Sequence, residues 1–403
     1  MRSGRRADAL VEAKQALDTR PEDAAACVLA ARLQPPDAAR KLLEKAVALD
    51  PKLATAWREL ARVHEDAGRL AEGVAAMERA VALRGSASHW NALGWLRERA
   101  GTSGGALDAY RAAIAADPSL SLARENLALL LSRLGRGDEA VREALAATQA
   151  APRRGAAWIA LGLVRAGAKD YAGAAEAYEK ALEVSPTDTV ALLSLGRAYR
   201  RLERFDLAER ALRRAAEAAP DDAAVSVDLG LLEMDRGDLP AAETYLRAAA
   251  KQVPKDGRPH YLLGLAADRA GRADDALKEY LKAAALAPDE GPYHLAAGFA
   301  YERKARLPEA LRCFEKAAES MPADPRPLAG QAAILQKQGK AKDAASRYER
   351  AVEMAPADRN LRLLLAILYA DGLRDDAKAA PHFAKYLALG GSAETIAPWY
   401  TGK

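Results

Sequence analysis

The sequence predicts an all-α protein built from one repeated pair of helices. Residues that pleated sheets prefer are scarce, with five isoleucines, nine threonines and 5% aromatic residues among 403. Eight prolines recur at a fixed interval of 34 residues, and the apolar residues between them recur at spacings of three and four. A large sheet is therefore not expected, whereas a helical repeat is.

The overall composition is that of a folded chain in a reducing compartment. Hydrophobic residues make up 50% and charged residues 29% of the chain, which argues against disorder. Its most apolar stretch, 361–370, is much shorter than the roughly 20 residues of a membrane span. The basic N-terminus has no apolar run behind it, so no secretory signal and a cytoplasmic location are expected. The two cysteines, Cys27 and Cys313, are too few for a disulfide framework or a four-ligand zinc site.

The recurring prolines mark the boundaries of the repeat. A proline has no N–H and disfavours helical geometry in the residue before it, so each one is expected to end a helix. Within each unit the apolar residues fall into two segments, which are separated by a short turn that contains glycine and charged residues. Each unit is therefore predicted to be two helices. The prolines are Pro118, Pro152, Pro186, Pro220, Pro254, Pro288, Pro322 and Pro356.

Small residues recur at two positions of the unit and predict a close contact between its helices. Ten alanines and Gly73 occupy the twentieth position of the repeat. Glycine occupies the eighth position in six repeats, although a glycine in a helix interior costs about 1 kcal/mol relative to alanine. The alanines are Ala39, Ala106, Ala140, Ala174, Ala208, Ala242, Ala276, Ala310, Ala344 and Ala379, and the glycines are Gly94, Gly162, Gly196, Gly230, Gly264 and Gly298.

These positions together resemble the tetratricopeptide repeat family. The motif WNALG at 90–94, followed by Ala106, Tyr110, Ala113 and Pro118, reproduces the family pattern. A second copy is WIALG at 158–162 with Ala174, Tyr178, Ala181 and Pro186. The resemblance implies a right-handed superhelix, or α-solenoid, in which the first helices of the units line the concave side.

The resemblance divides the chain into three parts. Residues 24–393 form an array of eleven helix-turn-helix units, residues 1–23 contain an N-terminal half repeat, and residues 394–403 form a C-terminal tail. Gly85 and Gly390 replace the boundary proline, and Gln331 stands where leucine is usual. The ends are far shorter than the 50 residues of a small domain, so no separate catalytic domain is expected.

No constellation of residues in the sequence predicts catalysis, a metal ion or a cofactor. The five histidines lack the spacing that places two ligands on one helix face, and no phosphate-binding loop or nucleophilic serine motif is present. His260 and His294 share the fourth position of successive units, which favours a packing role. The near balance of 60 basic and 56 acidic residues gives no case for nucleic-acid binding. We therefore expect a protein that is not an enzyme.

The fifth and ninth positions of the first helices predict a binding groove. They project about 100° to 140° away from the packing stripe, and in the central units they are mostly apolar. An accessible apolar stripe commonly binds an amphipathic helix or an extended segment, although neighbouring first helices could also bury these side chains against one another. The groove residues are Trp95, Leu129, Ile159, Leu163, Leu193, Val227, Leu231, Tyr261, Leu265, Leu295 and Phe299, with a basic cluster of Arg197, Arg200 and Arg201.

The function expected from these features is that of a non-catalytic scaffold or adaptor, whose groove holds a segment of a partner protein or a peptide. Two alternatives stay open: a regulatory sensor of a peptide or small ligand, and a structural subunit of a larger bacterial machine that uses its convex face. The arginine and alanine richness favours a bacterial source. Membership in a multiprotein complex is a further expectation.

Overall fold

The computed structural model describes residues 17, 19 and 22–399, and it confirms the all-α prediction. This part of the chain contains 23 α-helices, one π-helix and no strand. Most helices have 12 to 14 residues, as two helices per 34-residue repeat require. None of the helices in the described part combines the length and the apolar character that a membrane crossing needs.

The chain divides into two compact units, and the boundary lies between Ala218 and Ala219. In the first unit, the even-numbered helices are the first helices of the repeats and the odd-numbered helices are the second. They are α2 (Ala24–Ala31), α3 (Pro36–Leu49), α4 (Ala54–Asp66), α5 (Leu70–Leu83), α6 (Ala87–Arg99), α7 (Ser103–Ala116), α8 (Ser121–Arg133), α9 (Gly137–Ala150), α10 (Gly155–Gly167), α11 (Tyr171–Val184), α12 (Thr189–Arg201) and α13 (Phe205–Ala218).

The second unit continues the same alternation of first and second helices. Its helices are α14 (Ala223–Arg236), α15 (Leu239–Gln252), α16 (Arg258–Arg269), α17 (Ala273–Leu286), α18 (Gly291–Arg303), α19 (Leu307–Ser320), α20 (Pro325–Lys337), α21 (Ala341–Met354), α22 (Arg359–Ile367), the π-helix η1 (Leu368–Gly372), α23 (Asp376–Ala388) and α24 (Ala393–Ile396).

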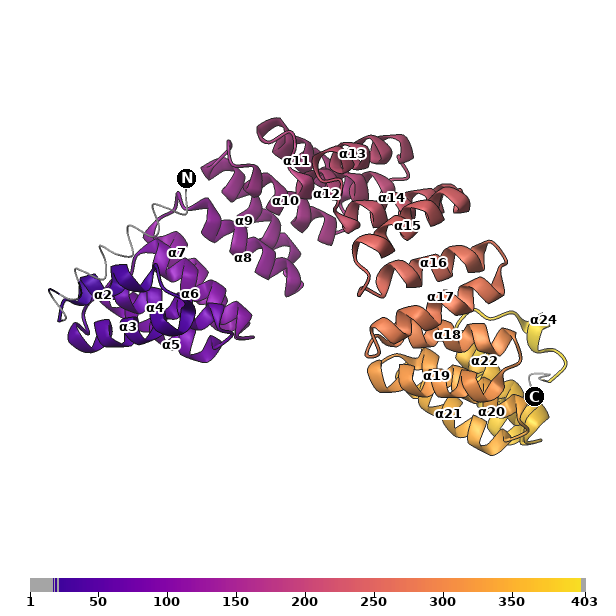
Figure 1. Ribbon diagram of the computed structural model, residues 1–403. Coiled ribbons are helices and arrows are strands. Elements are labelled where there is room, and N and C mark those ends of the chain that lie inside the picture. The colour runs from indigo at the N-terminus through magenta and orange to yellow at the C-terminus, as the bar shows by residue number, and fades with distance from the viewer. Residues whose placement is uncertain (1–16, 18, 20–21, 400–403) are drawn as a thin grey trace. The chain divides into compact units, whose positions relative to one another are not determined.

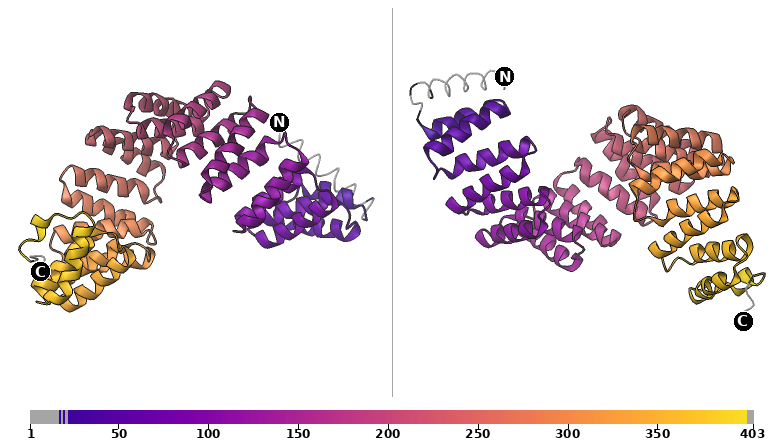
Figure 2. Two further views of the ribbon diagram at one scale, coloured as in Figure 1. Left: turned by 180° about the vertical axis from the view of Figure 1, so that it is seen from behind. Right: turned by 90° about the horizontal axis from the view of Figure 1, so that it is seen from below.

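Within each unit, every helix packs against its neighbours in the chain. Each first helix contacts the second helix of its own repeat, and each second helix contacts the next first helix, as α4, α5 and α6 do. Figures 1 and 2 show these antiparallel pairs side by side in each unit. The contacts are therefore local in sequence, as in other repeat proteins.

The turns explain where the helices end. Each boundary proline follows the end of a second helix, as Pro118 follows α7 and its C-cap Asp117, which confirms the predicted role of these prolines. In nine of the eleven repeats, the residue at the fifteenth position, in the turn between the two helices, is left-handed. Glycine supplies it at Gly68, Gly101, Gly135, Gly237, Gly271 and Gly339, while Lys169, Glu203 and Ala305 adopt it in three more repeats.

The small residues lie at the predicted helix crossings. All ten alanines at the twentieth position are buried. The eighth-position glycines face large side chains of the second helix: a Cβ atom on Gly162 would lie 2.3 Å from the ring of Tyr178, and one on Gly264 would lie 2.4 Å from Tyr280. Both predictions of close contact between the two helices are confirmed.

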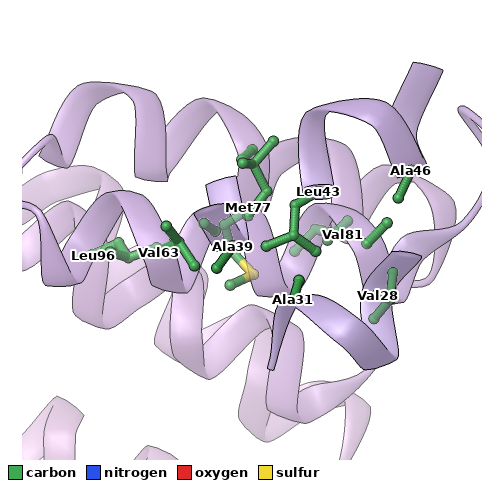
Figure 3. Packing of buried hydrophobic residues seen from close by; sticks show 14 of the residues in the cluster. Val28, Ala31, Ala39, Leu43, Ala46, Val63, Met77, Val81 and Leu96 are labelled. Atoms are coloured by element: carbon green, nitrogen blue, oxygen red, sulfur yellow. The ribbon is translucent and has the colours of Figure 1, made fainter. Parts of the chain in front are cut away.

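The N-terminal core shows how the repeats fuse into one apolar interior. Ala39 and Leu43 of α3, Val63 of α4 and Met77 of α5 meet in one cluster (Figure 3). The predicted N-terminal half repeat lies almost entirely outside the described residues. Of this segment, Leu17 packs against the same cluster.

The predicted C-terminal tail continues the core of the last repeat. Ile396 in α24 is buried. The Trp399 ring stacks on Phe383 with ring centroids 6.4 Å apart, and its indole N–H donates to Asp371 over 2.7 Å. Residues 393–399 therefore cover the end of the second unit, and residues 400–403 lie outside the described part.

Candidate functional site

The ninth position of the first helices carries the exposed apolar side chains of the predicted groove. Trp95 is 43% exposed, Leu163 41% and Phe299 38%. Leu129, Leu231 and Leu265 at the same position are partly buried. We call the surface formed by the second, fifth and ninth positions of the first helices the first-helix face.

The fifth position behaves differently, because it lies where neighbouring first helices meet. Leu193, Val227 and Leu295 are buried, whereas Ile159 and Tyr261 are partly exposed. The contact between first helices is direct, since Asn126 of α8 donates to Asn91 of α6 over 3.0 Å. Of the predicted groove residues, those at the ninth position therefore offer more surface to a partner.

Two exposed residues of this face, Leu122 and Val190, were missed by the sequence analysis. They occupy the second position of α8 and α12 and are 38% and 57% exposed. A spacing of seven residues is about 20° short of two helical turns, so the second and ninth positions point the same way. The seven-residue spacing from Leu122 to Leu129 was the signal that could have identified them.

In the first unit these side chains lie on four successive first helices, and we call them together the apolar surface of the first unit. The helices α6, α8, α10 and α12 contact one another in order along the unit. Their exposed or partly exposed apolar residues on the first-helix face are Trp95, Leu122, Leu129, Ile159, Leu163 and Val190. In the second unit, the corresponding residues are Leu231, Tyr261, Leu265 and Phe299 on α14, α16 and α18.

The three arginines of the predicted basic cluster all lie on α12. Arg197 and Arg201 are exposed and Arg200 is partly buried, and both Arg197 and Arg200 take part in further polar or electrostatic interactions. Burial raises the pKa of Tyr178 to about 12, and a hydrogen bond with Ser194 and the charge of Arg197 oppose this rise. The cluster places positive charge at one end of the apolar surface of the first unit.

A ladder of ion pairs borders the first-helix face. An acidic residue at the twelfth position pairs with a basic residue at the thirteenth position of the next repeat. In the second unit, Arg303 binds Asp268 over 2.6 Å and Lys337 binds Glu302 over 2.8 Å. In the first unit, Arg99 binds Glu65 over 2.6 Å and Arg133 binds Glu98. Such exposed pairs contribute only about 0 to 1 kcal/mol each, and each of them joins two neighbouring first helices.

A hollow of about 350 Å³ lies between α4 and α6 on this face. Trp95 forms one wall, Arg58 and Arg62 line it with Glu59, and Met77 and Leu96 add apolar surface. Glu59 is buried, and it accepts hydrogen bonds from Arg32, Arg58 and Arg62 over 2.8 to 3.1 Å. Burial raises the pKa of Glu59, but these arginine hydrogen bonds outweigh burial and hold the pKa below its usual value.

Replacing this carboxylate with an amide, Glu59→Gln, is expected to lower the free energy of unfolding by about 1 to 3 kcal/mol at pH 7. Since the folded-state pKa is lowered, the charged group stabilises the fold above its unfolded pKa near 4.5, and this contribution disappears as the pH falls through the lower folded value. Urea unfolding at pH 7 and pH 3 measures the difference between the two proteins, which should shrink at pH 3.

The matched control is Glu78→Gln, because Glu78 makes a single pair with Arg97 over 2.8 Å and its side chain is 47% exposed. Its effect should stay within about 0.5 kcal/mol at both pH values. A Glu59→Gln effect as small as this, or one that grows in acid, would contradict the role assigned to the buried carboxylate.

In the described part of the chain, no three histidine, cysteine, aspartate or glutamate side chains gather where they could hold a metal ion. His260 and His294 are both buried, and each has its own partner. The Nδ1 atom of His260 lies 2.6 Å from Glu279, and the Nε2 atom of His294 lies 2.8 Å from the carbonyl oxygen of Pro288. The first contact joins the two helices of one repeat, and the second joins α18 to the turn that follows α17, as packing residues do.

Comparison with family models and curated proteins supports the repeat assignment along most of the chain. Models described as tetratricopeptide repeat match residues 48–162, 165–227, 227–294 and 329–394. A heat-shock protein cognate co-chaperone, sgt12 of Aspergillus fumigatus, is 38% identical over 78 residues, which are 19% of this chain and 23% of that protein. Small glutamine-rich tetratricopeptide repeat-containing protein 2 of Mycosarcoma maydis is 34% identical over 87 residues, or 22% and 25% of the two chains. The match spans about a quarter of the length of these relatives.

Two solved structures share the fold over long stretches. Yeast Tom70 superimposes with a TM-score of 0.54 and 16% identity, covering 96% of both chains. A tetratricopeptide repeat protein from Parabacteroides merdae gives a TM-score of 0.51 and 18% identity over 61% of this chain and 98% of its own. At these identities the likeness concerns the fold alone.

Proposed function

Because this chain belongs to the tetratricopeptide repeat family of protein-interaction scaffolds, we propose that it is a non-catalytic adaptor that binds an apolar or amphipathic segment of a partner protein. The binding surface in this proposal is the first-helix face. The cytoplasmic location and bacterial source expected from the sequence are part of the same proposal.

The observation that carries the proposal is the row of exposed apolar side chains on the first unit. Trp95, Leu122, Leu163 and Val190 are each at least 38% exposed, and they lie on first helices that are neighbours in the stack. Contiguous exposed apolar surface is uncommon on a protein without a partner. A segment that covers it would bury large side chains, each worth about 1.5 to 3 kcal/mol.

The charges around this surface are suited to orienting a partner. The basic cluster of Arg197, Arg200 and Arg201 lies on α12, at one end of the apolar surface, and would favour a segment with acidic residues at that end. Exposed ion pairs contribute about 0 to 1 kcal/mol each, so apolar contacts dominate the affinity. The charges act mainly on the rate of association and on the direction in which the segment lies.

The experiment that tests the proposal is the substitution Leu163→Glu. The partner is first identified by co-purification and mass spectrometry, and its purified form is then titrated against both proteins. Burying a carboxylate in place of leucine should weaken binding at least tenfold at any salt concentration, since a loss of 1.4 kcal/mol corresponds to about tenfold. Substitutions Arg200→Ala and Arg201→Ala should weaken binding mainly at low ionic strength.

The matched control is Leu134→Glu. Leu134 is 44% exposed, close to the 41% of Leu163, but it lies at the C-cap of α8, outside the first-helix face. This variant should bind the partner as the unchanged protein does. A folded Leu163→Glu protein that keeps its affinity would exclude the first-helix face as the binding surface, and circular dichroism establishes that each variant is folded.

A further inference from the structure

A second kind of surface lies on the other side of the repeats, where two successive second helices flank a first helix. Hollows recur at this place in both units. In the second unit, one hollow lies between α15 and α17 over α16, and the next lies between α17 and α19 over α18. The two have the same position in the repeat but different chemistry.

The hollow between α15 and α17 is occupied by charged side chains that satisfy one another. Arg272 pairs with Glu243 and also with Asp275, and Arg247 binds Glu243 over 3.0 Å. Glu279 is engaged by His260 over 2.6 Å. This hollow therefore presents a neutralised surface.

The hollow between α17 and α19 is apolar at the corresponding positions. Leu281, Ala285 and Cys313 occupy the places that Arg247, Lys251 and Glu279 occupy one repeat earlier. Leu281 is 36% exposed, and Tyr301 of α18 also lines the hollow. The space measures about 430 Å³, which is room for a large apolar side chain. Three positions that carry polar residues in one repeat therefore carry less polar residues in the next, and all three line this hollow.

The rim of this hollow carries positive charge. Arg312 and Lys316 line it from α19 and are exposed, and within the described residues neither forms an ion pair within 4.0 Å. Glu309, the carboxylate on the rim, is bound by Arg306 over 2.9 Å, and the Arg306 guanidinium lies 4.8 Å from the centre of the Tyr301 ring. The hollow therefore combines an apolar floor with two available cations.

We propose that this hollow is a second protein-docking site, which receives a leucine or phenylalanine side chain flanked by carboxylates on an acidic amphipathic segment. The apolar floor selects the large side chain, and Arg312 and Lys316 select the neighbouring acidic residues by charge complementarity. The site lies on a different surface from the first-helix face, so the protein can hold two segments at once and act as a connector between them.

The native cysteines provide a direct readout of this hollow. Cys313 lines it and is partly exposed, whereas Cys27 is fully buried in the first unit, and both are free thiols. A segment seated in the hollow would cover Cys313. The rate at which N-ethylmaleimide modifies Cys313, followed by mass spectrometry of the intact full-length protein, therefore reports occupancy, with Cys27 as the unreactive internal control.

The probe is a synthetic amphipathic peptide of about 15 residues, long enough to form a helix, with leucine and phenylalanine on one side and glutamates beside them. At a peptide concentration ten times its Kd, the modification rate of Cys313 should fall about tenfold. A twin peptide with lysine in place of each glutamate should give no protection. Protection should also be lost in the double variant Arg312→Ala with Lys316→Ala.

A charge-matched control is the double variant Lys342→Ala with Arg350→Ala, whose exposed residues lie on α21, and this variant should keep the protection. The Leu163→Glu variant should keep it too, which separates this site from the first-helix face. The proposal is overturned if the acidic peptide leaves Cys313 reactive, or if the lysine twin protects equally. Protection that rises with protein concentration without peptide would assign the hollow to a second copy of this chain instead.

Discussion

Replacing Phe314 with alanine is expected to lower the free energy of unfolding of the second unit by about 3 to 5 kcal/mol. The Phe314 side chain of α19 is fully buried. A Cβ atom built on Gly298 of α18 would lie 2.6 Å from its ring, and one on Gly330 of α20 would lie 2.8 Å away. Both helices therefore approach closely around this ring, and alanine would leave a cavity that their backbones cannot readily close.

The matched control for this prediction is Phe299→Ala. The Phe299 ring meets the Phe314 ring edge-on with centroids 5.1 Å apart, yet it is 38% exposed. Its loss should cost less than about 1.5 kcal/mol, because water already reaches part of the side chain. Urea unfolding followed by circular dichroism compares the two variants. Equal costs would show that burial of Phe314 does not hold α18, α19 and α20 together.

The substitution Ala242→Leu is expected to destabilise the second unit by about 1 to 3 kcal/mol or more. Ala242 of α15 is fully buried. It lies at the crossing with α14, because a Cβ atom on Gly230 would come within 3.3 Å of the Ala242 carbonyl oxygen. Leucine adds three carbon atoms where the two backbones leave no space, so the helices must separate or the new side chain must leave its preferred rotamer.

The matched control for the alanine prediction is Ala248→Leu, on the same helix but at an exposed position. Leucine and alanine have similar helix propensities, so the free energy of unfolding should change by less than about 0.5 kcal/mol. Thermal and urea unfolding measure both variants. A harmless Ala242→Leu substitution would mean that the twentieth position does not lie at the helix crossing.

Much of the fold was predictable from the sequence, because its information is local and repeated. The proline interval set the length of the repeat, and the three- and four-residue apolar spacing predicted two helices in each repeat. The alanines of the twentieth position and the glycines of the eighth lie where the sequence placed them, at the helix crossings. Within each compact unit a repeat contacts its neighbours in the chain, so the pattern of one repeat predicts its surroundings.

The candidate site was less predictable, since exposure depends on side chains from other repeats. Leu193 at the fifth position and Leu163 at the ninth position of their repeats were both expected to be accessible, but Leu193 is buried and Leu163 is 41% exposed. Val190, with 57% of its surface exposed, was not recognised from the sequence. The contact between neighbouring first helices decides which residues of this face remain open, and helical periodicity alone does not specify that contact.

The sequence by itself thus determined the fold class, the repeat length and the helix pairing, because these follow from patterns within 34 residues. Only the tertiary structure decided which apolar residues stay exposed, that Arg32 at the end of α2 reaches Glu59 on α4, and that Leu281 and Cys313 share a hollow with the cations of α19. The physical reason is that each of these features joins side chains from different helices. Their meeting depends on how the helices pack, which the spacing of residues along one helix does not record.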